Sequence, residues 1–239
     1  MIMLKQEIIT KDGRRKLRCT DRSNDLNGEG ALFDRCFLMN VPESVARYEN
    51  FTHHLDGFDF GLIQVISPMK VFDCPAGWSP GGWSQFLTVL TILIQAHSRG
   101  YKRILILEDD YECPPDFSNR AVEAMRHVPP DWDVASFLGF GVVGSITIYN
   151  SYWRRLVNHC GQQCVAYNIE ALFSRPLPFF EVLSRPEYWV REMVYRAYLM
   201  DRSSTKNAEQ LGLKWYTVCN NIGEHPVKFA SDLLGLGED

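Results

Sequence analysis

The chain lacks long apolar runs, an excess of basic residues and a regular spacing of cysteines. Its longest apolar stretch, residues 86–94, is about half of the ~20 residues that a membrane-spanning helix needs. The first 18 residues hold no apolar segment of the secretory type, so we expect no signal peptide. The seven cysteines are odd in number and irregularly placed, which indicates a reducing compartment. These absences predict a cytoplasmic protein, with peripheral attachment to a membrane left open.

Neither sign of charge is in large excess, because 25 Lys and Arg stand against 29 Asp and Glu for a net charge of -4. A protein that lives on nucleic-acid backbone normally carries a basic excess, so this class is disfavoured. Apolar residues make up 46% of the 239 residues, and they include six Trp, ten Tyr and fourteen Phe. That content excludes disorder as the main state and suffices for the core of one domain.

The N-terminal segment is predicted to form a hairpin or arm over residues 1–30. Two short segments, 6–10 and 14–19, flank an Asp12-Gly13 turn dipeptide, and a polar connector follows. Seven Lys or Arg fall within the first 22 residues. This basic segment is either a solvated edge or a surface for an anionic acceptor. The main domain is then expected over residues 31–239.

Beyond residue 35, short apolar runs alternate with amphipathic stretches. Strands are expected at 36–41, 61–66, 103–107, 133–138, 144–149, 164–168 and 214–219. Helices are expected at 42–55, 83–98, 117–127, 152–159 and 188–199. Strands separated by helices of this length predict an α/β fold, with a mostly parallel sheet flanked by helices.

The sharpest feature is an apolar strand that ends in Glu108, Asp109 and Asp110 (the acidic tip). The carboxyl ends of parallel strands face the ligand crevice. If the strand stays extended, Glu108 and Asp110 point to one side, where two carboxylates suit a hard cation such as Mg²⁺ or Mn²⁺. Three adjacent acids repel one another unless something positive binds. The alternative is that the acids simply end a strand at the solvent edge.

Three other patterns are set aside. A phosphorelay receiver domain also has an acidic strand end, but it needs a later phosphoacceptor, and no Asp occurs between Asp133 and Asp201. The closely spaced pair Cys160 and Cys164 has no second such cysteine pair to complete a zinc site. A GxGxxG match at residues 139–144 is not followed by a clear helix, so it does not predict dinucleotide binding.

Five elements, taken in order and spacing, resemble glycosyltransferase family 25, the lipooligosaccharide-type galactosyltransferases and their collagen-modifying relatives. They are Phe37-Leu38-Met39-Asn40-Val41 with Arg47, Gly82-Trp83-Ser84-Gln85, the strand from Arg103 to Asp110, Trp132-Asp133 through Leu138-Gly139, and Ala166-Tyr167. The resemblance implies a GT-A fold and inverting transfer of a hexose from a UDP-sugar donor. It also implies a divalent cation, Mn²⁺ or Mg²⁺, that stabilises the departing diphosphate.

The resemblance also suggests roles for single residues. Glu108 and Asp110 are the expected metal ligands, and His225 in Gly223-Glu224-His225-Pro226 is a candidate third ligand. Donor contacts are expected from Asn40, Val41, Arg47, Asp109 and Gln85. Asp109 has two possible roles, in reaching the sugar or ribose or in holding its loop. Gln85 departs from the family, which commonly has His there, and an amide cannot titrate.

An inverting transfer needs a base that takes the acceptor proton, and the candidates are Glu170 and Asp201. The predicted function is therefore a metal-dependent glycosyltransferase that acts on a hydroxyl of a glycan, glycolipid or other polymer. Two alternatives stay open. The basic segment would suit glycosylation of a modified nucleic-acid base, and the Gln85 departure would suit an inactive glycan-binding scaffold.

Overall fold

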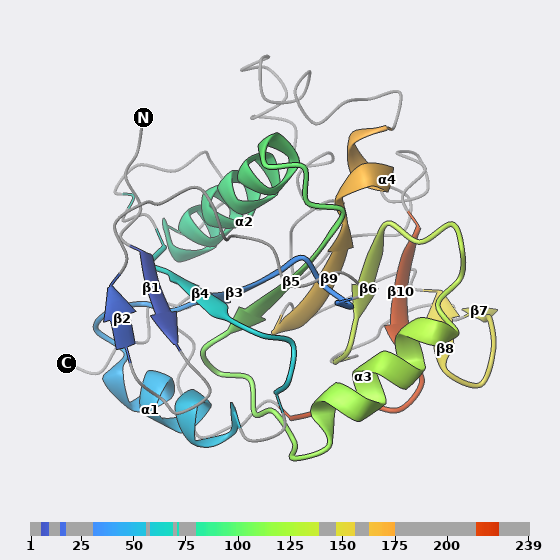
Figure 1. The fold of residues 1–239 in the computed structure, drawn as a ribbon, viewed down its shortest axis with the longest axis horizontal. Helices are drawn as coiled ribbons and strands as arrows, with labels where there is room; N and C mark the ends of the chain where they lie inside the picture. Colours follow the sequence, from blue (N-terminus) through green and yellow to red (C-terminus); the bar gives the residue numbers. More distant parts are fainter. Residues whose placement is uncertain are drawn as a thin grey trace.

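In the computed structural model, the described residues include ten strands that form one sheet, with helices on both faces (Figure 1). The structure describes residues 6–9, 15–17, 31–55, 58–68, 71, 80–138, 147–155, 163–174 and 214–224. In sheet order the strands are β2 (Arg15–Leu17), β1 (Gln6–Ile9), β4 (Ile63–Ile66), β3 (Arg35–Met39), β5 (Arg103–Glu108), β9 (Cys164–Asn168), β6 (Val134–Ser136), β10 (Trp215–Val218), β8 (Trp153–Arg155) and β7 (Thr147–Ile148).

The sheet is mixed, which corrects the expectation of a mostly parallel one. Strands β4, β3 and β5 run parallel to one another, and so do β6 and β10. The other pairings are antiparallel, because β9 runs back between β5 and β6 and because β1, β2, β7 and β8 are added as antiparallel neighbours. A strand's residue pattern is the same in both directions, so the sequence alone did not distinguish them. The α/β class itself is confirmed.

The described helices are divided between the two faces of the sheet. The helices α1 (Val45–His53) and α3 (Phe117–Arg126) lie on one face, whereas α2 (Pro80–Ser98) and α4 (Ile169–Phe173) lie on the other (Figure 1). Side chains alternate along β5 accordingly. Leu105 and Leu107 join the core under α1 and α3, and Ile104 and Ile106 join the core under α2.

The N-terminal hairpin is confirmed as a pair of strands, since Ile8 of β1 lies opposite Lys16 of β2. It is also part of the main sheet, because Ile8 lies opposite Gln64 of β4 on its other side. The boundary between an arm and a domain near residue 30 stays a prediction.

Several helices differ from the expectation. Helix α1 begins at Val45 rather than at Pro42, because Pro42 and Glu43 form a turn after β3. Helix α2 begins at Pro80, ahead of the expected start at Trp83. The helix expected at 152–159 is wrong in its first half, where β8 (Trp153–Arg155) pairs with β10. The helix expected at 188–199 lies outside the described residues. Among the helices that the structure describes, none has the length and apolar content to cross a membrane.

Candidate functional site

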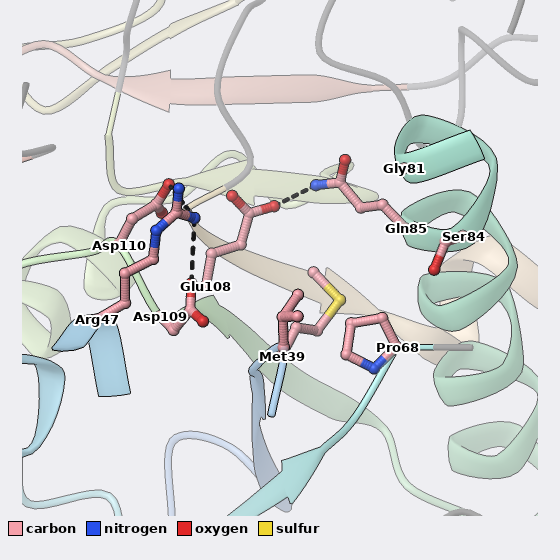
Figure 2. A pocket seen from close by; sticks show the side chains of 10 residues that line it. Met39, Arg47, Pro68, Gly81, Ser84, Gln85, Glu108, Asp109 and Asp110 are labelled. Atoms are coloured by element: carbon pink, nitrogen blue, oxygen red, sulfur yellow. Dashed lines mark hydrogen bonds and ion pairs between the residues drawn. The ribbon is translucent and has the colours of Figure 1, made fainter. Parts of the chain in front are cut away.

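A pocket lies where the parallel strands β4, β3 and β5 end and helix α2 begins (Figure 2). The pocket is partly open to solvent. Its lining residues are Met39, Val41, Arg47, Pro68, Gly81, Ser84, Gln85, Glu108, Asp109 and Asp110. The whole acidic tip therefore faces one cavity at the carboxyl edge of the parallel strands, as the crevice rule predicted.

The acidic tip does not continue as an extended strand. Strand β5 ends at Glu108, and a turn follows in which the amide of Tyr111 donates to the Glu108 carbonyl at 3.2 Å. Alternation along a strand therefore does not decide where Asp109 and Asp110 point. The expectation that Glu108 and Asp110 share one side of a strand does not apply, although both line the same pocket.

Asp109 is buried and is held by the neighbouring strand. Because Met39 and Glu108 lie opposite each other in the β3–β5 ladder, the next residues, Asn40 and Asp109, also meet. The Asn40 amide Nδ2 donates to Asp109 Oδ2 at 2.8 Å. This hydrogen bond performs the loop-holding role, one of the two that the sequence suggested for Asp109.

Arg47 supplies a positive charge beside the acidic tip, although it is distant from the tip in the sequence. Its guanidinium nitrogen lies 3.7 Å from Asp109 Oδ1 and 3.8 Å from Asp110 Oδ2, and Figure 2 shows the two contacts. The Arg47 side chain is 12% exposed. The repulsion among the three acids is thus relieved by an internal cation, so that repulsion alone no longer requires a metal.

Glu108 is held from the opposite side by helix α2. The Gln85 amide Nε2 donates a hydrogen bond to Glu108 Oε1 (Figure 2). Burial, and then the nearby Glu108 charge, raise the pKa of Tyr167, so this phenol on β9 stays neutral. The acidic tip is therefore divided, with Glu108 next to α2 and the two aspartates next to α1.

A late segment of the chain runs beside the acidic tip. The backbones of Glu112 and Glu224 pair with each other, with amide-to-carbonyl distances of 2.9 and 3.2 Å. The Tyr111 hydroxyl donates to the carbonyl of Ile222. Gly223 has a φ of 106°, and a Cβ at this position would overlap the Tyr111 ring. Residues 222–224 are therefore held against Tyr111 and Glu112, the two residues that follow Asp110.

The chemistry of the pocket fits a divalent cation held by few protein ligands. Glu108 and Asp110 offer the oxygen donors that Mg²⁺ and Mn²⁺ prefer. Within the described part of the chain, no three His, Cys, Asp or Glu side chains gather closely enough to hold a metal. A cation here would take two carboxylates from the acidic tip and complete its coordination with phosphate, water or residues outside that part. Such a ligand set is usual for Mg²⁺ sites that bind substrate phosphates.

The structure brings together most, but not all, of the expected site residues. Glu108, Asp109 and Asp110 share the pocket with Val41, Arg47 and Gln85, and Asn40 adjoins it through Asp109. His225 and Asp201 lie outside the described residues.

Glu170 lies at the other end of the strands, beside the beginning of β5 rather than its end. It follows β9, which is antiparallel to β5, and the neighbouring Ile169 amide bonds to Lys102 just before β5 begins. The six residues of β5 separate the two edges by roughly 20 Å, so Glu170 cannot serve this pocket as a base.

Several lining residues carried no chemical signal in the sequence. Met39 and Ser84 fell within the family-like elements without an assigned role. Pro68 was not singled out at all, although it is the second residue after β4, as Val41 is the second residue after β3. The parallel pairing of β3 and β4 could have indicated Pro68, because the residues that follow neighbouring parallel strands lie at the same side of the sheet.

No family model and no curated protein matches the chain. Three crystal structures among the solved structures are similar at low identity. A197 from STIV is 13% identical, with 81% of this chain and 86% of that chain covered and a TM-score of 0.40. Mouse xyloside xylosyltransferase 1, in its apo form, is 12% identical, with 74% and 80% covered and a TM-score of 0.42. Mannose-1-phosphate geranyltransferase from Thermus thermophilus is 14% identical, with 76% and 58% covered and a TM-score of 0.39.

Two of these three names describe transferases. TM-scores below 0.5 do not establish a shared fold, so the function of this chain has to be argued from its own pocket. The resemblance to glycosyltransferase family 25 has no support from a family model.

Proposed function

We propose that the chain transfers a hexose from a nucleoside-diphosphate sugar, with UDP as the nucleotide, to a hydroxyl of a glycan, glycolipid or other polymer. The observation that supports this most is the pocket in which the acidic tip of β5 faces the first turns of α2. Carboxylates and a helix amino end in one cavity suit a cation and an anion that bind as a pair.

The diphosphate of the donor would lie between α2 and α1. The first turn of α2 carries no acidic residue, and Gly81 and Ser84 from that end line the pocket. Backbone N–H groups at a helix amino end attract phosphate oxygens. Arg47 lies on the other side of the acidic tip, where a guanidinium can bind phosphate with two parallel hydrogen bonds.

Glu108 and Asp110 would hold a divalent cation, Mn²⁺ or Mg²⁺, beside that diphosphate. When bound, the metal acts as a Lewis acid that stabilises the negative charge on the departing phosphate. We propose His225 as a third ligand, because the preceding residue, Glu224, is paired with Glu112 close to Asp110.

The nucleoside would contact the end of β3. Val41 lines the pocket, and Asn40 fixes Asp109 from the same turn. Asp201 remains our candidate for the base that takes the acceptor proton, since Glu170 lies at the wrong edge of the sheet. A GT-A-like fold and kinship with family 25 belong to this proposal, and they are supported by the five sequence elements only.

The experiment is incubation with a panel of nucleotide sugars and Mn²⁺, with release of free nucleoside diphosphate as the readout. We expect one donor to be hydrolysed without acceptor, and Asp110→Ala to reduce that release by about 100-fold or more. Asp116→Ala is the matched control, because Asp116 is an exposed acid with a side chain 61% accessible, paired with Arg120 outside the pocket. Undiminished release by Asp110→Ala would remove Asp110 from the mechanism.

One observation favours a second function, that of an inactive glycan-binding scaffold. Gln85 stands where the resemblance places His, and its amide holds Glu108, one of the two expected metal ligands. Isothermal titration with UDP and Mn²⁺ separates the two functions. Metal-dependent binding of UDP supports the transferase, and binding of a glycan without any metal-dependent binding of UDP supports the scaffold.

A further inference from the structure

The Arg47 guanidinium is shared between two carboxylates rather than bound tightly to one. The distances of 3.7 Å to Asp109 and 3.8 Å to Asp110 exceed the ~2.7–2.9 Å of a direct charge-assisted hydrogen bond. Figure 2 shows the guanidinium beside the carboxylate of Asp110, on the side of the pocket away from α2. Arg47 therefore acts on the acidic tip mainly through its charge.

The backbone of Arg47 is fixed on α1, and its long side chain extends from that helix to the pocket. Tyr48 and Phe51 of the same helix are buried in the core under α1, at 6% and 0% exposure. These anchors hold α1 against the sheet. An arginine side chain has several rotatable bonds between its Cα and its guanidinium, so the charge can move without the helix.

A divalent cation bound to Asp110 would come close to this guanidinium. Two positive charges around the same carboxylate repel each other, and the repulsion is strong in a partly buried pocket where water screens poorly. The Asp110 side chain is 15% exposed and that of Asp109 is 7% exposed. Metal binding by the free protein therefore competes with Arg47.

We propose that Arg47 is a built-in counter-ion of the acidic tip, and that a nucleoside diphosphate must draw it away before a divalent cation binds tightly. The proposal rests on the function proposed above and adds an order of events to it. A diphosphate provides the guanidinium with a better partner, because planar N–H pairs match phosphate oxygens. The carboxylate of Asp110 is then released to the cation.

The arrangement makes the metal and the nucleotide mutually dependent. If the nucleotide raises the affinity for the metal by some factor, the metal raises the affinity for the nucleotide by the same factor. Part of this coupling comes from direct contact between cation and phosphate. The contribution of Arg47 to the coupling is the loss of metal affinity that its charge causes when no nucleotide is bound.

The test is the affinity for Mn²⁺ alone, measured by isothermal titration and by the paramagnetic resonance signal of free Mn²⁺. We expect Arg47→Gln to bind Mn²⁺ about tenfold or more tightly than the unaltered chain, because the competing charge is gone. Arg126→Gln is the control for loss of one positive charge. It removes an exposed arginine that pairs with Glu123 on α3, and its Mn²⁺ affinity should stay unchanged.

Two further variants keep the result interpretable. Arg47→Lys retains a positive charge and should bind Mn²⁺ as weakly as the unaltered chain. Arg47→Met removes the charge with a similar apolar stem, and it replaces Arg47→Gln if circular dichroism shows that the latter does not fold. Equal or weaker binding of Mn²⁺ by the neutral variants would overturn the proposal.

The same titrations with UDP present complete the cycle. UDP should tighten Mn²⁺ binding by a larger factor in the unaltered chain than in Arg47→Gln, and equal factors would overturn the role of Arg47. None of these readouts involves sugar transfer. Tighter Mn²⁺ binding by Arg47→Gln, together with no hydrolysis of any nucleotide sugar, would support the counter-ion role of Arg47 and contradict the proposed transferase function.

Discussion

At the scale of single residues, the site is built from pairs that lie far apart in the sequence. Asn40 and Asp109 are 69 residues apart, and Gln85 and Glu108 are 23 apart. Each pair sets the direction of one carboxylate of the acidic tip. The site is therefore pre-organised by neutral amides and one guanidinium before any ligand arrives.

Gly223 carries a prediction at this scale. Its φ of 106° lies in the region that side chains avoid, and a Cβ would overlap the Tyr111 ring. We expect Gly223→Ala to lower the free energy of unfolding by about 2–4 kcal/mol in a denaturant titration. It should also reduce donor hydrolysis, because Tyr111 begins the loop after the acidic tip.

Gly100 provides the matched control for Gly223. Its φ is 74°, but the space around it is open. Gly100→Ala should cost only the backbone strain, about 1 kcal/mol. Equal losses in the two variants would mean that Tyr111 does not restrict position 223.

At the scale of elements, the functional pocket depends on which strands are parallel. Strands β4, β3 and β5 end together, so Pro68, Met39 and Glu108 reach the same cavity. Strand β9 runs the other way and carries Glu170 to the far edge. The direction of each strand therefore decides whether the residues that follow it lie at the pocket or at the opposite ends of the strands.

The pairing of β1 makes a second prediction. Ile8 lies between Gln64 of β4 and Lys16 of β2, so a proline there removes a ladder hydrogen bond within the sheet. We expect Ile8→Pro to lower the free energy of unfolding by about 3 kcal/mol, whereas Ile8→Val should have little effect. An unchanged denaturation midpoint for Ile8→Pro would show that the N-terminal segment is an independent arm.

At the scale of the whole molecule, the core under α1 and α3 encloses reactive groups in their neutral form. Burial raises the pKa values of the Cys36, Cys113 and Cys164 thiols well above their usual range. All three thiols lie within this core, together with Tyr111. These thiols are therefore inert packing groups and not nucleophiles.

The thiols give the molecule a predictable response to alkali. Each binds its proton in the folded state after the unfolded chain has lost it, so the unfolded state binds fewer protons above pH ~9 and stability falls as pH rises. The loss is about 1.4 kcal/mol per pH unit for each thiol. Cys36→Ala should reduce the slope of stability against pH between about 9.5 and 10.5 by that amount.

The measurement is urea denaturation in the presence of a reductant, at several pH values. Comparing slopes cancels the pH-independent cost of the cavity that Cys36→Ala leaves behind. An unchanged slope would show that Cys36 ionises equally readily in the folded protein.

Elements with strong local patterns could be predicted from the amino-acid sequence. The strands around residues 36–39, 63–66 and 103–108 and the helices around 83–98 and 117–126 follow from apolar periodicity, and the acidic tip follows from three adjacent letters. Each of these signals depends on neighbours in the chain, which a sequence displays directly.

The folded structure was needed to show which way β9 runs, that β1 joins β4, and that residues 153–155 form a strand instead of a helix. It alone placed Arg47 against Asp109 and Asp110, and Gln85 against Glu108. Strand direction and the meeting of distant side chains depend on how sheets and helices pack, and no local pattern records that packing.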